Sequence, residues 1–303
     1  MKLRELLIER YAVLHNLKDR TIELQAGSID KFALFLGREP EVSDLNDLTI
    51  SKFCRWRATT KWRGRTVSAA TVKKDLTHLT GLWNFCARKR MKNAEGEMLE
   101  FPDLPRNLLR VPQKVPRGYK VEEVSAMIRA AKDRCGRVGP VEGAWFWQTI
   151  IMAAWYTGAR IGSLQGVRWG DVDLEAGRIV FRAEEYKGGL KSIVRAIPAD
   201  LVARLRTGVR AEGELVWPWR DYRRGATSIF QALRFICHSA GVTPRGFHAI
   251  RKASGSYVKA GGGDATDHLA HENPRTTRQS YLDPTITGQQ SALDYLPPLD
   301  LGE

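Results

Sequence analysis

Five short segments in the second half of the chain carry side chains that can bind phosphate or move protons. The segments TGAR, YKGG, HAIR, HLAH and SYLD contribute Arg160, Lys187, His248, Arg251, His271 and Tyr281. Guanidinium groups can hold a phosphate through paired hydrogen bonds and keep their charge at neutral pH. An imidazole can move a proton, and a phenol can act as a nucleophile once a nearby base or cation activates it. Each segment alone is weak support, because such residues are more often structural.

The elements that must position these residues are mostly helical. The apolar run at residues 144–156 predicts a helix buried on nearly all sides, which ends shortly before Arg160. This run is shorter than the ~20 residues that a membrane span needs, so we expect no membrane partner. His248 and Arg251 are three residues apart and therefore share one face of a predicted helix.

One β region lies between the two arginines. Residues 178–182 (RIVFR) predict a strand. Residues 184–187 and 192–197 predict the two arms of a hairpin, with Lys187 entering a turn that contains two glycines. The second half of the chain is therefore expected to form a mixed α+β domain.

The N-terminal third predicts a small helical bundle. Leu3, Leu6, Leu7 and Leu14 recur at helical spacing, and Ser68 is the predicted N-cap of a later helix. Four prolines within residues 101–116 cannot continue a helix and predict a linker. We expect an N-terminal helical DNA-binding domain at 1–112, a linker at 113–117 and a catalytic domain at 118–303. The predicted fold class is mainly α with a small antiparallel β-sheet.

The positive charge of the chain is concentrated in one region. The 303 residues carry a net charge of +14, and residues 51–92 hold twelve basic residues but only one acid, Asp75, so this region alone carries +11. Such a concentration favours nucleic-acid binding, and solubility is the alternative interpretation. The predicted DNA-binding residues are Lys52, Arg55, Lys61, Arg63, Arg65, Lys73, Lys74, Arg88, Lys89 and Arg90.

Other features of the sequence exclude several classes. The four cysteines are widely spaced without a CxxC pair, which argues against a disulfide framework and a zinc site and fits a reducing cytosol. Asp171 and Asp173 have the spacing of a metal pair, but we interpret them as turn and capping carboxylates just before a strand. There is no GxxxxGK[ST] loop for ATP, and the charged N-terminus has no signal-peptide core. We therefore predict no metal and no cofactor, and a cytoplasmic location.

Taken in this order, the segments resemble the tyrosine recombinase (phage integrase) family over nearly the whole chain. The family pattern has a TGxR turn followed by a WxDxD-like segment, a hairpin written roughly K-G-x-x-K-x-R-x-V/I-P, an HxxR pair, an LGH segment and a tyrosine. This sequence matches it at Thr157–Arg160, Trp169–Asp173, Lys187–Pro198, His248/Arg251, Leu269–His271 and Tyr281. The N-terminal helices resemble the core-binding, SAM-like domain of the family.

The chain departs from the family pattern at two places. Ala270 replaces the usual glycine before the histidine, a change from one small residue to another. Tyr281 follows His271 by ten residues, one more than in the commonest pattern, and Ser280 occupies the position at the shorter spacing. Because serine cannot take the role of the family tyrosine, Tyr281 is the expected nucleophile.

The resemblance implies a simple two-domain, Xer/integrase-like recombinase that acts on double-stranded DNA sites. Tyr281 would form a 3′-phosphotyrosyl intermediate, Lys187 would protonate the leaving 5′ oxygen, and His271 would hydrogen-bond the scissile phosphate. On chemical grounds Arg160 and Arg251 would clamp the phosphate, and His248 is the best candidate for the base. Four protomers would assemble on two DNA sites in a prokaryotic or phage-type setting at the nucleoid. The tail after Tyr281 could link protomers, or it could pack on its own domain.

Two other function classes stay open at this point. A type IB topoisomerase-like enzyme has a similar pocket but relaxes DNA as a monomer. A DNA-binding regulator that has lost catalysis is the second alternative, and the complete set of six residues argues against it.

Overall fold

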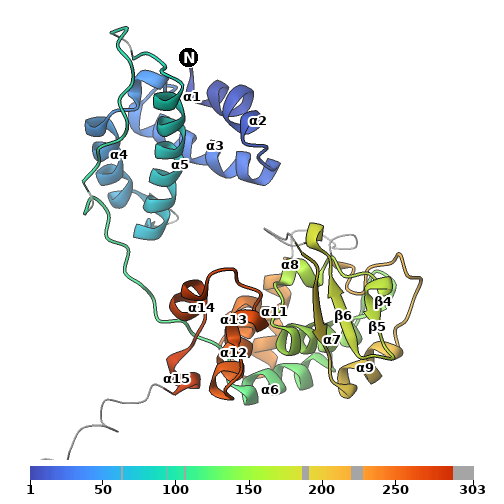
Figure 1. Ribbon diagram of the computed structural model, residues 1–303. Helices are drawn as coiled ribbons and strands as arrows, with labels where there is room; N and C mark the ends of the chain where they lie inside the picture. Colours follow the sequence, from blue (N-terminus) through green and yellow to red (C-terminus); the bar gives the residue numbers. More distant parts are fainter. Residues whose placement is uncertain (63, 94, 106, 186–190, 220–227, 289–303) are drawn as a thin grey trace, which may run out of the picture. The chain divides into compact units, whose positions relative to one another are not determined.

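A computed structural model of the chain describes residues 1–303 except 63, 94, 106, 186–190, 220–227 and 289–303 (Figure 1). The chain divides into two compact units, Met1–Gln113 and Lys114–Glu303. Both are mainly helical with small antiparallel sheets, which confirms the predicted fold class. Among the described helices, none combines the length and the apolar character that crossing a membrane requires.

The first unit is a bundle of helices around one apolar core. Its elements are α1 (Leu3–Glu5), a π-helical stretch (Leu6–Tyr11), α2 (Ala12–Leu14), α3 (Asp19–Leu36), a 3-10 turn (Val42–Asp44), α4 (Asp47–Thr59), β1 (Lys61–Trp62), β2 (Arg65–Thr66) and α5 (Ala69–Arg88). The Ser68 hydroxyl accepts the N–H of Thr71 at 3.2 Å and so caps α5, as predicted. The short hairpin of β1 and β2 between α4 and α5 was not predicted.

The second unit is built around α7 (Gly143–Thr157), which confirms the buried helix expected from the apolar run. Helix α7 packs against α6, α9 and α12, and α8 follows it directly. The other elements are α6 (Val121–Ala131), β3 (Arg137–Val138), β4 (Val141–Glu142), α8 (Ile161–Leu164), a 3-10 turn (Trp169–Asp171), β5 (Val172–Asp173), β6 (Arg178–Phe181), a 3-10 turn (Ala183–Glu185), β7 (Ile193–Ala196), α9 (Ala199–Arg206), α11 (Ile229–Ser239), α12 (Phe247–Ala260), α13 (Ala265–His268), α14 (Pro274–Ser280) and α15 (Pro284–Thr287).

The sheet of the second unit corrects one sequence prediction. Strands β5, β6 and β7 are antiparallel in that order, and β6 pairs directly with β7, with Ile179 opposite Arg195 and Phe181 opposite Ile193. The predicted strand at 184–187 is wrong at residues 184 and 185, because Ala183–Glu185 form a 3-10 turn, and residues 186 and 187 lie outside the described residues. The two glutamates of this turn offer no apolar side chain for the inner face of the sheet, which Ile179 and Phe181 already fill.

Candidate active site

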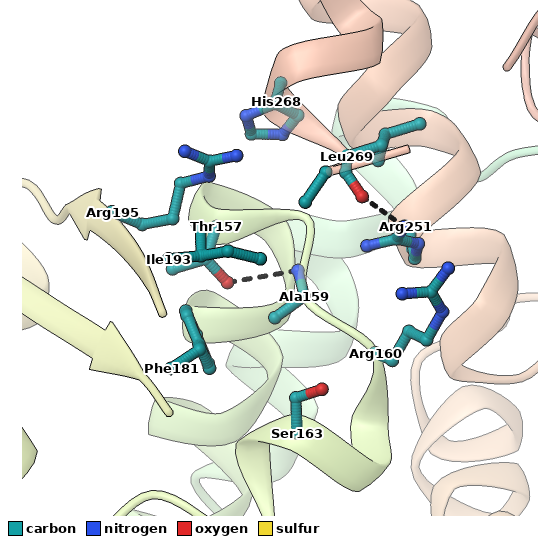
Figure 2. A pocket seen from close by; sticks show the side chains of 11 residues that line it. Thr157, Ala159, Arg160, Ser163, Phe181, Ile193, Arg195, Arg251, His268 and Leu269 are labelled. Carbon is teal, nitrogen blue, oxygen red and sulfur yellow. Dashed lines mark hydrogen bonds between the residues drawn. The ribbon is translucent and has the colours of Figure 1, made fainter. Parts of the chain in front are cut away.

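The end of α7 aims Arg160 at a pocket (Figure 2). Gly158 ends the helix with a φ of +60°, and a Cβ there would lie 2.7 Å from Nε2 of His268, so only glycine fits. The Thr157 hydroxyl accepts the N–H of Ala159 at 3.2 Å and thereby tightens the turn. Arg160 follows with extended backbone as the N-cap of α8. The TGAR segment is therefore a rigid corner that presents one guanidinium.

Arg251 holds the other side of the pocket together. It lies on α12 and is only 3% exposed. Its guanidinium donates to the carbonyl of Gly158, to that of Leu269 at 2.5 Å and to Nε2 of His271 at 2.9 Å. Burial, followed by the charge of Arg160, lowers the pKa of Arg251 to about 10, so the group stays protonated at neutral pH. Arg251 thus joins the end of α7 to the turn between α13 and α14.

Tyr281 lies at the end of α14 with its ring among three basic side chains. The residue is 8% exposed, and its ring centroid lies 4.3 Å from that of His271 and 4.9 Å from that of His248, both edge-on. The Cζ atom of Arg251 lies 5.3 Å from the same centroid. Ser280, the residue at the shorter family spacing, is exposed. The structure therefore places the Tyr281 ring against Arg251, which lines the pocket, and leaves Ser280 exposed.

Both histidines beside Tyr281 are neutral at pH 7. The pKa of His248 is lowered by loss of hydration and then by the charges of Lys252, Arg251 and Arg160. Burial, together with Arg251, Arg160 and His248, lowers the pKa of His271 to about 4. Because Nε2 of His271 accepts from Arg251, its Nδ1 carries the hydrogen and donates to the Thr277 hydroxyl at 2.8 Å. His248 can therefore take up a proton, whereas His271 orients Arg251.

Two further basic residues of the pocket escaped the sequence reasoning. Arg195 lies on the inner face of β7, donates to the carbonyl of Asp267 and lies 3.7 Å from its carboxylate. The Nε2 atom of His268 lies 2.6 Å from the Ser254 hydroxyl, and this hydroxyl donates to the backbone carbonyl of Trp155 at 2.6 Å. Both line the pocket with Arg160 (Figure 2). The sequence signal that could have identified Arg195 is a charged residue at a position where the alternation of the strand side chains faces inward.

The turn before His271 explains one departure from the family pattern. Ala270 has a φ of +48°, in the left-handed region where glycine is favoured because it has no Cβ. The glycine of the family pattern at this position suits that conformation, and Ala270 adopts it at a cost. The carbonyl of the preceding Leu269 accepts from Arg251, so the turn matters for the geometry of the pocket.

The remaining predicted site residues are placed as follows. Lys187 lies outside the described residues, in the segment that joins β6 to β7. Asp171 accepts the N–H of Arg168 at 2.9 Å and pairs with Arg182, and Asp173 accepts the N–H groups of two following residues. These are turn and capping contacts. Within the described part of the chain, no group of three His, Cys, Asp or Glu residues is placed to hold a metal ion.

His268 and His271 make the stability of the second unit depend on pH. Burial lowers the pKa of His268 to about 4, as it does for His271, from an ordinary value of 6.5. Protons therefore bind the unfolded chain more readily, and the stabilisation present above pH 6.5 is lost as pH falls toward 4. We expect the urea unfolding free energy to fall over this interval, and less steeply in His268→Gln. Equal slopes in both proteins would contradict this assignment.

The predicted DNA-binding residues form the basic surface of the first unit. Arg63 lies outside the described residues, and the other nine are exposed. The single acid of the region, Asp75, is only 1% exposed and accepts from Arg57 at 2.9 Å and from Ser28 at 2.8 Å. The acid is buried with Arg57, and its Oδ1 also lies 3.1 Å from the ammonium group of Lys74, so it pairs with one of the predicted DNA-binding residues.

The basic surface has two parts along α5. Lys73 and Lys74 lie in its first two turns, close in sequence to the β1–β2 hairpin that carries Lys61 and Arg65. Arg88 and the two basic residues after it lie at the other end of the helix. At 1.5 Å per residue, the fifteen residues from Lys73 to Arg88 correspond to ~22 Å. The structure therefore does not gather all nine residues into one cluster.

Comparisons with known proteins agree with this geometry. The family model described as "Phage integrase family" matches residues 120–286. A curated XerC-type tyrosine recombinase of Pseudomonas aeruginosa is 24% identical over 214 residues, which cover 66% of this chain and 46% of that protein. This chain thus spans about half the length of that relative.

Two solved structures share the fold. The XerH site-specific recombinase in a post-cleavage complex with its palindromic difH substrate has a TM-score of 0.68 and 16% identity, over 92% of this chain and 80% of that one. A lambda integrase tetramer bound to a Holliday junction has a TM-score of 0.60 and 16% identity, over 90% of this chain and 78% of that one. The family model covers more than half of the chain, and the chain belongs to the phage integrase family of tyrosine recombinases.

Proposed function

We propose that this chain is a site-specific DNA recombinase that cuts and rejoins DNA through a covalent 3′-phosphotyrosyl intermediate on Tyr281. The observation that carries the proposal is the ring of Tyr281 lying against Arg251, His248 and His271, with Arg160 close enough for its charge to lower the pKa of Arg251. A pocket of permanent positive charge beside a phenol suits attack on a phosphodiester, whose nonbridging oxygens gain negative charge in the transition state.

In this proposal each residue has a separate role. The phenol oxygen of Tyr281 attacks phosphorus, the bond from phosphorus to the 5′ oxygen breaks, and the neutral imidazole of His248 takes the phenol proton. Lys187 gives a proton to the leaving 5′ oxygen. Arg160 and Arg251 bind the nonbridging oxygens, and His271 holds Arg251 in place. For His271 itself to hydrogen-bond the phosphate, a proton would have to occupy Nε2.

The same chemistry explains why we propose neither ATP nor a metal. The phosphotyrosyl bond retains the energy of the phosphodiester, so the 5′ hydroxyl of a strand can reverse the reaction and join the ends. Two arginines supply the positive charge that a metal ion would otherwise provide.

We further propose that the protein assembles as a tetramer on two DNA sites and acts in the cytoplasm of a prokaryotic cell, at the nucleoid. The lambda integrase with the same fold was solved as a tetramer on a Holliday junction, which supports this proposal. The tail at 289–303 lies outside the described residues, so its role in linking protomers stays a prediction.

Covalent capture of DNA tests the proposed function. The protein is incubated with a pool of nicked substrates whose cleaved fragment diffuses away, and the DNA in the trapped complexes is sequenced. We expect attachment at the 3′ phosphate of one recurrent sequence. Relaxation of supercoils without strand exchange would favour a topoisomerase, and tight DNA binding without any adduct would favour a regulator.

The salt dependence of DNA binding tests the basic surface. Replacing Arg65, Lys73 and Lys74 with Gln should reduce the slope of log K against log salt concentration by ~0.9 for each DNA phosphate that the protein no longer neutralises. The matched control replaces three exposed basic residues of the same unit outside the region, Arg10, Lys18 and Arg20. An unchanged slope in the first variant, or an equal drop in the control, would show that this surface does not face DNA.

A further inference from the structure

The chain just after Tyr281 is fastened by a buried carboxylate. Asp283 is 2% exposed, and its Oδ2 accepts the N–H of Gly118 at 2.7 Å, across 165 residues of sequence. Its Oδ1 accepts the N–H of Thr285 at 2.9 Å and the Thr285 hydroxyl at 2.7 Å. Burial alone would raise the pKa of Asp283, but these hydrogen bonds and the charge of Arg117 lower it. The carboxylate is therefore ionised at neutral pH and receives three donors.

A second contact ties the same segment to α12. Ser256 on α12 is fully buried, and its hydroxyl accepts the N–H of Asp283 at 2.8 Å and lies 3.4 Å from the carbonyl oxygen of Tyr281. Helix α12 also carries His248 and Arg251. The backbone that follows the tyrosine is therefore bound to the helix that supplies two of the side chains around its ring.

Gly118 brings the start of the second unit to the same place. A Cβ at Gly118 would lie 2.9 Å from both Cα and N of Ala253, so the chain here passes directly over the α12 backbone. This close approach lets the Gly118 N–H reach Asp283. We call Gly118, Ser256 and Asp283 the latch, because the three join the entry of the unit, α12 and the segment after Tyr281.

We propose that Asp283 is a positioning residue that, through the latch, holds the Tyr281 ring against His248, His271 and Arg251 of its own protomer. Helix α14, which ends at the tyrosine, has only seven residues, and so short a helix is not stable by itself. Beyond the latch, Ile286 packs on the core of the same unit, so the described chain as far as Gly288 stays with its own protomer. The proposal rests on the proposed function, since it assigns the residue that aims the nucleophile.

Asp283→Asn is the sharpest test, because it keeps the shape of the side chain and replaces one acceptor oxygen with a donor NH2 group. At either Gly118 or Thr285, the new NH2 group then faces a hydrogen-bond donor from which the carboxylate oxygen used to accept. The matched control is Asp173→Asn, an exposed aspartate that accepts two backbone N–H groups within its own turn. The rate of single-turnover adduct formation is measured at saturating and at limiting concentrations of a nicked DNA that carries the sequence recovered in the covalent-capture experiment.

We expect Asp283→Asn to slow adduct formation at saturating DNA by ~10–100-fold, since misplacing a reacting group by about 1 Å has effects of that order. The DNA concentration for half-maximal rate should stay unchanged, and Asp173→Asn should match the wild type. A merely structural role would instead lower the active fraction or weaken DNA binding. A wild-type rate in Asp283→Asn, or a loss explained by the fraction unfolded, would overturn the proposal.

Ser256→Ala supplies a second variant if Asp283→Asn does not fold. It should slow adduct formation in the same way, and the double variant should be no slower than the slower single one, because both break one latch.

Hydrogen exchange gives a readout independent of activity: the amides of Gly118 and Asp283 should exchange faster in either variant, and unchanged exchange would also overturn the latch. If the wild type forms no adduct with any DNA, the proposed function fails, and the exchange data alone decide on the latch.

Discussion

Replacing Tyr281 with Phe is expected to abolish the covalent DNA adduct and to leave DNA affinity unchanged. The change removes only the hydroxyl group, so the ring keeps its edge contacts with His248 and His271 and its place beside Arg251. Without the nucleophilic oxygen, no bond to phosphorus can form. Adducts are counted by denaturing gel after incubation with a nicked substrate, and affinity is measured on the intact duplex.

The matched control is Tyr257→Phe. Tyr257 lies on α12 in the same unit, and its hydroxyl accepts the N–H of Val121 at 3.2 Å, a contact without a role in the pocket. This variant should form the adduct at a rate close to that of the wild type. An adduct that persists in Tyr281→Phe would show that another residue is the nucleophile.

Replacing Arg160 should lower the rate of adduct formation alone, whereas replacing Arg251 should lower both the rate and the stability of the protein. Among the residues that the structure describes, the Arg160 guanidinium makes no hydrogen bond or ion pair, and its charge lowers the pKa of the buried Arg251, so Arg160→Gln should lower the adduct rate by roughly 10²–10³ without lowering the unfolding free energy. Arg251→Gln should lower the rate at least as far. It should also destabilise the protein by about 1–3 kcal/mol, because the buried carbonyls of Gly158 and Leu269 lose their donor.

Two measurements on the same samples check this difference. Single-turnover capture gives the rate, and urea unfolding gives the free energy of the second unit. Equal stability of the two variants would show that the hydrogen bonds of Arg251 do not hold the pocket together. An adduct rate in Arg160→Gln close to that of the wild type would remove Arg160 from the proposed phosphate clamp.

Local patterns predicted most of the helices. Helix α7 follows from an apolar run interrupted by Gln148, and the start of α5 follows from Ser68, whose hydroxyl caps it. Both signals act within a few residues, so no knowledge of distant contacts is needed. The strand expected at 184–187 could not be judged from local signals, because the strand that pairs with β6 depends on which residues can fill the inner face of the sheet.

Residues that work through distant contacts could not be found in this way. Asp283 looks like an ordinary helix cap in the sequence, and its bond to Gly118 spans 165 positions. Asp75 reads as one acid within a basic region, and only the structure shows that it is buried beside Arg57 and pairs with Lys74. The charge of Arg195 gave a signal, but its approach to the pocket depends on the pairing of β7 with β6.

The sequence by itself determined the chemical groups, the helices that carry them and the family, because residue types, spacing and periodicity are local properties. Only the tertiary structure decided how these groups meet. It set the ring of Tyr281 against two neutral histidines and a buried arginine, left Ser280 exposed, and fastened the chain after the tyrosine to the start of the unit. Burial and hydrogen bonds between residues far apart in the chain produce this arrangement, and they exist only once the chain has folded.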